Sequence, residues 1–181
     1  MPESDRGRVL LGIARDAIAD PSGPRTPRDW DHEWLREWAA TFVTLRDASG
    51  DLRGCIGTVD AHRPLGDDVA HNAHAAAYRD PRFGAVDSRE RPTLGVEVSV
   101  LTPRVALVAK SEAEAIASLR PGEDGVVFEY RDQHATFLPQ VWENLPDALA
   151  FLSELRRKAR LPPRFWHDDV RLWRYRVEKH A

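Results

Sequence analysis

The only cysteine of the 181-residue chain, Cys55, lies in the hexapeptide Leu52-Arg53-Gly54-Cys55-Ile56-Gly57. If this segment is a strand, Arg53, Cys55 and Gly57 share one face, because side chains alternate between the two faces of a sheet. A cation close to a thiol favours the thiolate, which is the reactive form. The flanking Gly54 and Gly57 would let a backbone or a small ligand approach closely. The pattern therefore predicts a nucleophilic thiol at Cys55 that is activated by Arg53.

The sequence leaves a second interpretation of this cysteine open. Free cysteine is among the most buried residue types and behaves as a small hydrophobe. In this interpretation Leu52 and Ile56 anchor the strand and Cys55 is a packing residue. The solvent access of the thiol decides between the two.

Two polar residues after the hexapeptide are candidates for binding a substrate. Asn72 falls on the apolar stripe of an expected helix, and a buried side chain left without a hydrogen bond costs roughly 1–3 kcal/mol. It therefore either holds a loop or contacts a ligand. Arg82 lies in Asp80-Pro81-Arg82-Phe83, which follows the end of that helix. Asp80 could cap the turn while Arg82 reaches back to the cysteine face, and both residues could instead be purely structural.

Glu97 is a candidate for proton transfer. It alternates with the valines of an expected strand and points to the face opposite them. An acidic side chain in such a position is rarely buried unless it is paired, and Arg53 and Arg82 are the available partners. An ion pair between strand and loop and a role in a site are both open.

Histidine is the natural base for a thiol. Three histidines follow the hexapeptide closely, namely His62, His71 and His74. The last two have the helical spacing i, i+3, which could seat a metal but is more typical of two solvent-exposed side chains. A Cys–His pair is open, and no metal ligand set is predicted.

Ordered blocks along the chain resemble the AMMECR1 domain family, whose bacterial and archaeal members are named AmmeMemoRadiSam system protein A. The blocks are Phe42–Leu45, Leu52–Thr58, Asn72-Ala73, Asp80–Phe83, Val96–Leu101, Gly122–Val126, Ala135–Trp142 and Arg174–Glu178. The resemblance runs from about Arg8 to Glu178, and the stretch from Arg25 to Trp38 matches no block. It implies one AMMECR1-like domain over residues 1–181 with a core at about 8–178.

The resemblance also implies partners. Bacterial relatives look like the first component of a set that includes a Memo-type protein, similar to class III extradiol dioxygenases, and a radical SAM protein. This chain has a single cysteine, so it lacks the three-cysteine motif of a radical SAM cluster and cannot form an internal disulfide. We expect no cofactor and no metal in this chain, and redox chemistry would belong to the partners.

Composition limits the remaining classes of protein. A net charge of −3 with scattered arginines gives no basic stripe of the kind that binds nucleic acid. No segment approaches the roughly 20 apolar residues of a membrane span, and the charged N-terminus lacks the apolar region of a signal peptide. We expect a cytoplasmic protein that binds neither nucleic acid nor membrane.

The hydrophobic periodicity predicts interspersed hairpins and helices rather than regular βαβ units. Helices are expected over 9–19, 32–38, 65–79, 111–119 and 146–160, hairpins over 40–59 and 126–138, single strands over 94–100 and 170–177, and a loop through Pro21, Gly23, Pro24 and Pro27. In the helix 146–160 we expect Leu149, Leu152 and Leu155 to face the core while Arg156, Arg157 and Lys158 face water. The fold class is therefore α+β, a mostly antiparallel β-sheet packed with helices, with room for a small second lobe.

Two functions remain. In the first, Cys55 attacks a small carbonyl or amide, backbone N–H groups near Gly54 and Gly57 hold the oxyanion, and Glu97 or a histidine moves protons. Arg82 and Asn72 would bind the substrate, and the protein would be a cysteine-dependent hydrolase or acyl transferase. In the second, the same residues line a cleft that recognises a ligand or a partner's tail without turnover.

Overall fold

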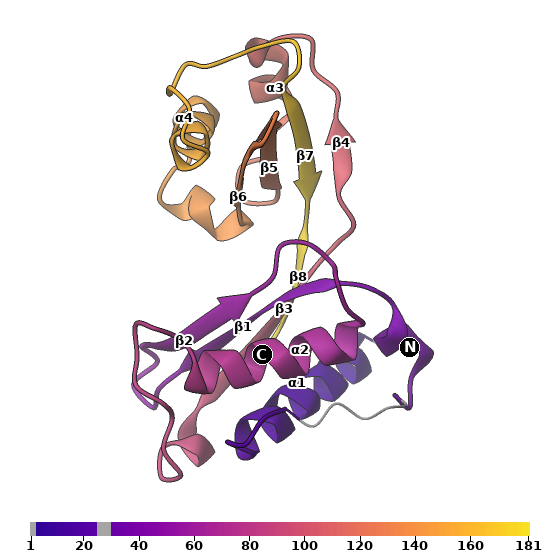
Figure 1. Cartoon of the computed structure of the whole chain (residues 1–181), viewed down its shortest axis with the longest axis vertical. Helices are drawn as coiled ribbons and strands as arrows, with labels where there is room; N and C mark the ends of the chain where they lie inside the picture. The colour runs from indigo at the N-terminus through magenta and orange to yellow at the C-terminus, as the bar shows by residue number, and fades with distance from the viewer. Residues whose placement is uncertain (1–2, 25–29) are drawn as a thin grey trace. The chain divides into compact units, whose positions relative to one another are not determined.

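The computed structural model describes residues 3–24 and 30–181 (Figure 1). The chain divides into two compact units, Met1–Leu101 with Glu178–Ala181, and Thr102–Val177. The fold is α+β with antiparallel sheets, as the sequence predicts. Within the described residues, no helix has the length and apolar character needed to cross a membrane.

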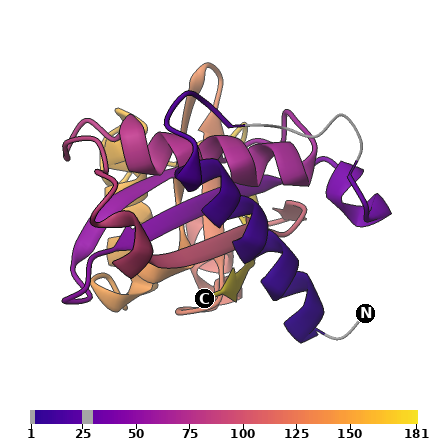
Figure 2. The same ribbon diagram turned by 90° about the horizontal axis from the view of Figure 1, so that it is seen from below.

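The first unit is a four-stranded sheet with the strand order β2-β1-β3-β8. Its elements are α1 (Glu3–Ala19), β1 (Ala40–Arg46), β2 (Leu52–Gly57), α2 (Leu65–Tyr78), β3 (Gly95–Leu101) and β8 (Val177–His180). Figures 1 and 2 show α1 and α2 on the same face of this sheet, which leaves the other face without helices from this unit. Because β2 is at the edge, the strand of Cys55 has a neighbour on one side only.

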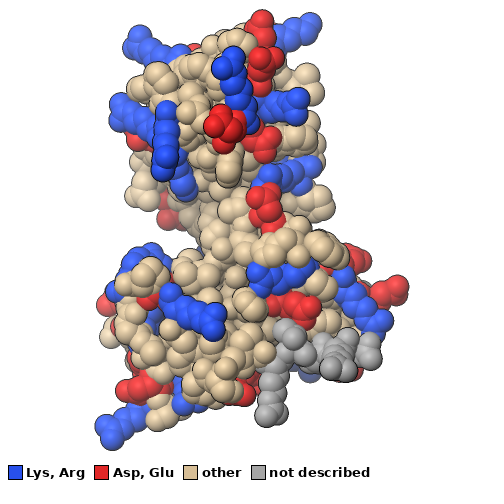
Figure 3. All heavy atoms as spheres, in the orientation of Figure 1, with Lys and Arg blue, Asp and Glu red and all other residues tan. Residues whose placement is uncertain are grey.

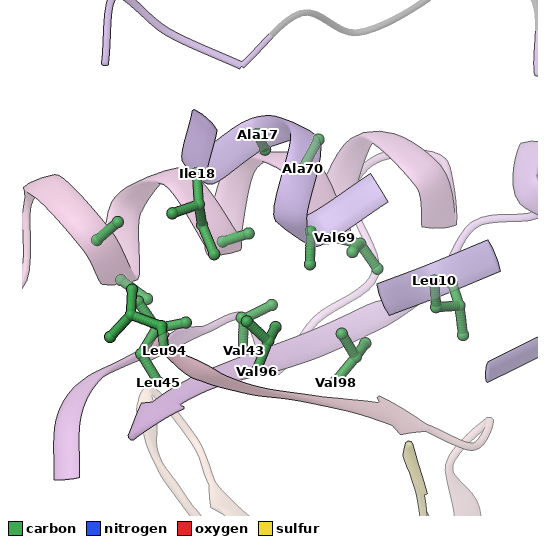
Figure 4. Packing of buried hydrophobic residues seen from close by; sticks show 14 of the residues in the cluster. Leu10, Ala17, Ile18, Val43, Leu45, Val69, Ala70, Leu94, Val96 and Val98 are labelled. Carbon is green, nitrogen blue, oxygen red and sulfur yellow. The ribbon is translucent and has the colours of Figure 1, made fainter. Parts of the chain in front are cut away.

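Alternation along β1 and β3 builds the core of the first unit. Val43, Val96 and Val98 point to the helices and are at most 5% exposed. Figure 4 shows them below Val69 of α2 and Ile18 of α1. Alternate residues of the same strands point to the face without helices. That face carries apolar as well as polar side chains, for example Phe42 and Glu97.

The second unit is a four-stranded sheet with the order β4-β7-β5-β6. Its elements are β4 (Val105–Leu107), α3 (Glu112–Ser118), β5 (Gly125–Tyr130), β6 (Gln133–Phe137), α4 (Ala148–Lys158) and β7 (Arg171–Tyr175). Trp142, in the 3₁₀ turn Pro139–Glu143, stacks on Phe151 at 3.7 Å between ring centroids and donates to the carbonyl of Asp124 at 2.7 Å. The Leu138–Trp142 block is therefore a rigid corner of this unit's core.

Both hairpins, the strand β3 and the helices α2 and α3 are confirmed close to their expected positions. Ser111 caps α3 by accepting from the backbone N–H of Glu114, as the sequence predicts. The expected helix 32–38 is only a 3₁₀ turn, Glu33–Arg36. Pro27 of the expected loop and residues 25–29 of the unmatched stretch lie outside the described residues.

Three expectations about the fold were wrong. The strand expected over 170–177 is two strands, β7 and β8, one in each sheet, and β4 was not expected. In α4, Leu149 is 48% exposed rather than in the core. Arg156 is fully buried rather than in water, because its guanidinium donates to Glu112 of α3 and to the carbonyl of Pro163.

Charged side chains of both signs are interspersed on the face of each unit seen in Figure 3. No continuous basic stripe crosses either unit on that face. This distribution gives no support to a phosphate-binding surface there.

Candidate functional site

The glycines beside Cys55 make room for the protein itself. A Cβ added at Gly54 would lie 2.2 Å from the carbonyl oxygen of Ala76 in α2, and one added at Gly57 would lie 2.2 Å from the ring of Phe42. Only glycine permits approaches this close. The space that we expected a ligand to occupy at these glycines is therefore filled by a helix backbone and an aromatic ring.

A buried aspartate and an arginine clamp the backbone of Cys55 on the open edge of β2. The N–H of Cys55 donates to Asp80 Oδ2 at 2.9 Å, and its carbonyl accepts from Arg82 Nη2 at 3.1 Å. Arg82 also donates to both oxygens of Asp80, from Nη2 at 2.7 Å and from Nε at 3.0 Å. The pair thus supplies the acceptor and the donor that a further strand would provide, which protects an otherwise open edge.

The pKa of Asp80 is held far below its usual range. Its hydrogen bonds from Arg82 are the largest cause, burial opposes them, and the N–H groups of Cys55 and Arg82 add to the lowering. The Asp80 side chain is 1% exposed, whereas that of Arg82 is 54% exposed. The clamp therefore has a sealed anion and a solvent-facing cation. The hypothesis that Arg82 reaches back to the cysteine is confirmed.

The thiol of Cys55 is half-buried and accepts a hydrogen bond from Thr44 Oγ1 at 3.4 Å. Asp80 is the largest cause of the raised pKa of Arg82, and Cys55 is a smaller one. Arg82, which donates to the carbonyl of Cys55, is thus the cation beside this residue. Arg53, on the same face of β2, was expected in that role.

Arg53 instead forms a bidentate pair with Glu90. Its Nε donates to Oε2 at 3.0 Å and its Nη2 to Oε1 at 2.7 Å, and Glu90 is the largest cause of its raised pKa. The Phe83 ring lies beneath both guanidinium groups, 5.9 Å from that of Arg53 and 5.5 Å from that of Arg82. Arg53 therefore reaches the cysteine's surroundings through a shared aromatic contact.

Glu97 and Cys55 share the face of the sheet that α1 and α2 do not cover. Thr44 on β1 is paired with Cys55 on β2 and with Glu97 on β3, so the three lie in one row across the sheet. Strands lie 4.7–4.9 Å apart, which separates the Cα atoms of Cys55 and Glu97 by about 10 Å. Glu97 pairs with Lys179 of β8 at 3.0 Å, so the expectation of Arg53 or Arg82 as its partner was wrong.

Asn72 lies on the opposite, helix-covered face of the sheet. Its Nδ2 donates at 3.0 Å to the carbonyl and the hydroxyl of Thr41 and to Asp68 Oδ2. Asp68 Oδ2 also accepts from the N–H and the hydroxyl of Thr41 and from the hydroxyl of Thr58, at 2.7–2.8 Å. Asn72 is 3% exposed and Asp68 is 0% exposed. This network joins α2 to β1 and to the end of β2, which is the structural role left open by the sequence.

Sequence reasoning missed Asp68, although a signal was present. Residues i and i+4 of a helix are neighbours on its surface, so Asp68 had to lie beside Asn72 on the buried stripe. The other oxygen of Asp68 lies 3.3 Å from Arg63 Nε. Two polar residues on one apolar stripe predict a shared buried network.

Two of the three histidines, His71 and His74, belong to α2, which covers the face of the sheet opposite the thiol, and His71 is exposed as expected. His74 is 4% exposed, packs on Tyr78 and lies 3.3 Å from the carbonyl of Pro21, so the expectation of exposure was wrong for it. His62 contacts Asp60 and Arg63 in an exposed position. Over the described ranges, no hydrogen bond joins a histidine to Cys55, and no group of three or more His, Cys, Asp or Glu could hold a metal.

The five residues that we expected in one pocket thus divide among three places. Cys55 and Arg82 are in direct contact, and Arg53 joins them through Phe83. Glu97 lies two strands away on the same face, and Asn72 is on the other face. We call the first group, with Asp80 and Thr44, the Cys55–Arg82 site.

These features define an α+β protein whose cysteine strand is held at the sheet edge by an Asp–Arg pair. The same fold occurs in the crystal structure of an uncharacterised protein from Pyrococcus horikoshii, which is 32% identical and has a TM-score of 0.79 over 96% of this chain and 89% of that one. The family model described as AMMECR1 matches residues 11–180. The chain belongs to the AMMECR1 family, which confirms the resemblance inferred from the ordered blocks.

Relatives in archaea match nearly the whole chain. A protein of Methanothermobacter thermautotrophicus is 38% identical over 184 residues, which cover 96% of this chain and 93% of that protein. A protein of Saccharolobus solfataricus is 36% identical over 177 residues, covering 93% of this chain and 78% of its own length.

Proposed function

We propose that this AMMECR1-family protein is a binding module, in which the Cys55–Arg82 site recognises a ligand or a partner's tail without turnover. One observation carries the proposal: the charged groups around Cys55 are already committed to partners inside the fold. Asp80 holds Arg82 and the cysteine N–H, and Glu90 holds Arg53.

Nucleophilic catalysis needs a base within hydrogen-bond reach of the nucleophile and free donors for the oxyanion. The N–H of Cys55 already donates to Asp80, and the carboxylate of Glu97 is paired with Lys179. A reaction at the thiol would require at least one of these contacts to break first. Recognition requires no such change.

Arg82 supplies the group through which a ligand would bind. Its side chain is 54% exposed. Its hydrogen bonds use Nε and Nη2, which leaves Nη1 without an acceptor among the described residues. A guanidinium fork is suited to carboxylates. The site therefore suits the carboxylate of a small molecule or of an acidic peptide tail.

We infer that the partner is a Memo-type protein in the cytoplasm, in a system that also includes a radical SAM protein. The support is membership of the AMMECR1 family, whose bacterial members resemble the first component of such a system.

The proposal is tested by calorimetric titration of the full chain with the Memo-type protein encoded in the same genome. Arg82→Ala should weaken binding by about 10-fold or more, which corresponds to about 1.4 kcal/mol, and Cys55→Ser should change it less than about 2-fold. Arg89→Ala is the matched control, because Arg89 is an exposed arginine of the following loop. Equal affinities for Arg82→Ala and the unchanged protein would contradict the assignment of this site.

A cysteine-dependent hydrolase or acyl transferase is the second candidate. It is favoured by one observation: Thr44 donates to the sulfur, and Arg82 donates to the carbonyl of the same cysteine. The rate of alkylation of the native protein by iodoacetamide between pH 5 and 9 separates the two functions. Rapid reaction well below the ordinary thiol value of about 8.5, lost in Arg82→Ala, would favour the enzyme; a thiol that reacts only after unfolding would eliminate it.

A further inference from the structure

A hollow lies in the first unit, on the helix-covered side of the sheet. Its volume is about 350 Å³, and the end of α1, the start of β3 and the turn Arg91–Thr93 form its walls. Ile18, Leu94 and Val96 contribute apolar walls and are at most 5% exposed themselves. This size falls at the lower end of the range for small-molecule pockets, about 300–1,000 Å³.

Two arginines line the hollow and no acidic residue does. Arg15 is exposed and has no hydrogen bond or ion pair within the described part of the chain. Arg91 donates from Nη1 to the carbonyl of Ala19 at 2.7 Å, and its Nε is buried without a hydrogen-bond partner among the described residues. Most buried donors are satisfied, so the pocket holds both an unpaired cation and an unsatisfied donor.

We propose that this hollow binds a small amphipathic carboxylate. The apolar body would lie against Ile18, Leu94 and Val96, and the carboxylate would bind Arg15 and Arg91. Guanidinium groups match carboxylates in geometry and charge. An uncharged ligand of the same size would leave Arg15 without a counter-charge.

The position at the end of α1 requires one further condition. The C-terminus of a helix carries partial negative charge, which would repel an anion. Arg91 offsets this charge because it donates to the carbonyl of Ala19, the last residue of α1. The same side chain thus satisfies the helix end and turns it into a place where an anion is tolerated.

The hollow is separate from the Cys55–Arg82 site, because Val96 and Cys55 lie on opposite faces of the sheet. Glu90, which holds Arg53, is nevertheless the residue directly before Arg91. The proposal does not depend on the proposed function, and either can fail alone.

The test is a titration of the ¹⁵N-labelled full chain with 4-phenylbutyrate, followed by amide chemical shifts. The neutral 4-phenyl-1-butanol is the matched ligand. We expect saturable shifts at Ile18, Ala19, Leu94 and Val96, with a Kd of about 1–5 mM for a ligand of this size. The alcohol should bind at least about 10-fold more weakly.

Variants test which arginine supplies the positive charge that binds the carboxylate. Arg15→Ala should weaken the acid's binding about 5-fold, because an exposed ion pair contributes up to about 1 kcal/mol, and should leave the alcohol unaffected. Arg91→Lys retains the charge and the helix-end contact, and Arg89→Ala is the control outside the hollow. The proposal would be overturned if the acid and the alcohol bound equally well, or if chemical shifts changed only on other surfaces or nowhere. It would also be overturned if the Arg15→Ala variant bound the acid like the unchanged protein.

Discussion

Asp68 and Asp80 are both almost fully buried, at 0% and 4% exposure, and both hold the ends or edge of the strand that carries Cys55. Asp68 accepts from Thr41, Thr58 and Asn72 on the helix-covered face. Asp80 accepts from Cys55 and Arg82 at the open edge of β2. The Oδ2 atom of Asp68 thus accepts from neutral donors, with Arg63 Nε 3.3 Å from the other oxygen. Asp80 accepts instead from backbone N–H groups and from Arg82, a solvent-facing cation.

This difference shows which of the two networks a ligand can change. The neutral donors to Asp68 Oδ2 lie on α2, on β1 and at the end of β2, and the packing of α2 against the sheet holds them in place. Arg63, the cation beside the other oxygen, is only 24% exposed. Arg82 is 54% exposed and can contact a second acceptor without leaving Asp80. The buried network therefore sets the shape of the site, while the edge clamp offers a group for recognition.

The largest loss of folding stability is expected from Asp68→Ala. The change leaves the amide of Asn72 and the hydroxyl and N–H of Thr41 without their acceptor, and removing a buried, charged partner costs about 3–5 kcal/mol. Urea denaturation measures the free energy of unfolding. The control Asp67→Ala, which removes a single part-buried hydrogen bond from Trp30, should cost about 1 kcal/mol; equal losses would show that the Asp68 network has no special weight.

The second-largest loss of stability is expected at Gly54, on the face of the cysteine strand that α2 covers. Gly54→Ala places a Cβ 2.2 Å from the carbonyl oxygen of Ala76, which is backbone and cannot rotate away. Overpacking of this kind costs about 1–3 kcal/mol, measured by the same denaturation. Gly84→Ala meets nothing within 4 Å and serves as the control. A Gly54→Ala variant as stable as Gly84→Ala would mean that α2 shifts without cost.

These contacts mark how far the sequence could predict the molecule. Alternation and helical periodicity predicted β1, β2, α2 and β3 because each pattern depends on local burial. The same periodicity placed Arg156 in water, since a charge at a helix end is usually solvated. Its partner Glu112 is 44 residues away and on another helix, so no local pattern could reveal the pair.

The candidate site divides in the same way. The sequence placed Arg82 just after a helix end, from where it could reach back to the cysteine face, and its hydrogen bond to the Cys55 carbonyl confirms that contact. The partners of Arg53 and Glu97 did not follow, because Glu90 and Lys179 are brought in by a turn and by β8, whose places in the fold depend on long-range topology. Sequence alone identified the charges but not their pairing.

A third prediction concerns the stability of the fold at acidic pH. The pKa of Asp80 is lower in the folded than in the unfolded chain, so the carboxylate stabilises the fold at neutral pH and this contribution falls once the pH drops below the unfolded value of about 3.9. Asp80→Asn should therefore cost about 1.5–3 kcal/mol at pH 7 and progressively less toward pH 3. Denaturation at both pH values measures the difference.

Other acidic residues do not affect this comparison between the Asp80→Asn variant and the unchanged protein. Glu90 and Asp87 also have lowered pKa values, but they are present in both proteins and cancel in the difference between them. A cost for Asp80→Asn that is the same at pH 7 and pH 3 would show that the clamp works through shape rather than charge.

The smallest effect on stability, and the most specific one, is expected at Thr44. Thr44→Val removes the hydroxyl that donates to the Cys55 sulfur at 3.4 Å, and the loss of one part-buried hydrogen bond costs about 0.5–1.5 kcal/mol. A donor to sulfur favours its charged form, so alkylation of the native variant by iodoacetamide at fixed pH should slow about 2–5-fold. Thr41→Val, in the Asp68 network, is the matched control, since it should destabilise the fold more while leaving the alkylation rate unchanged. Slower alkylation in both variants would mean that the two networks act as one unit, and the contrast between a closed and an adjustable aspartate site would fail.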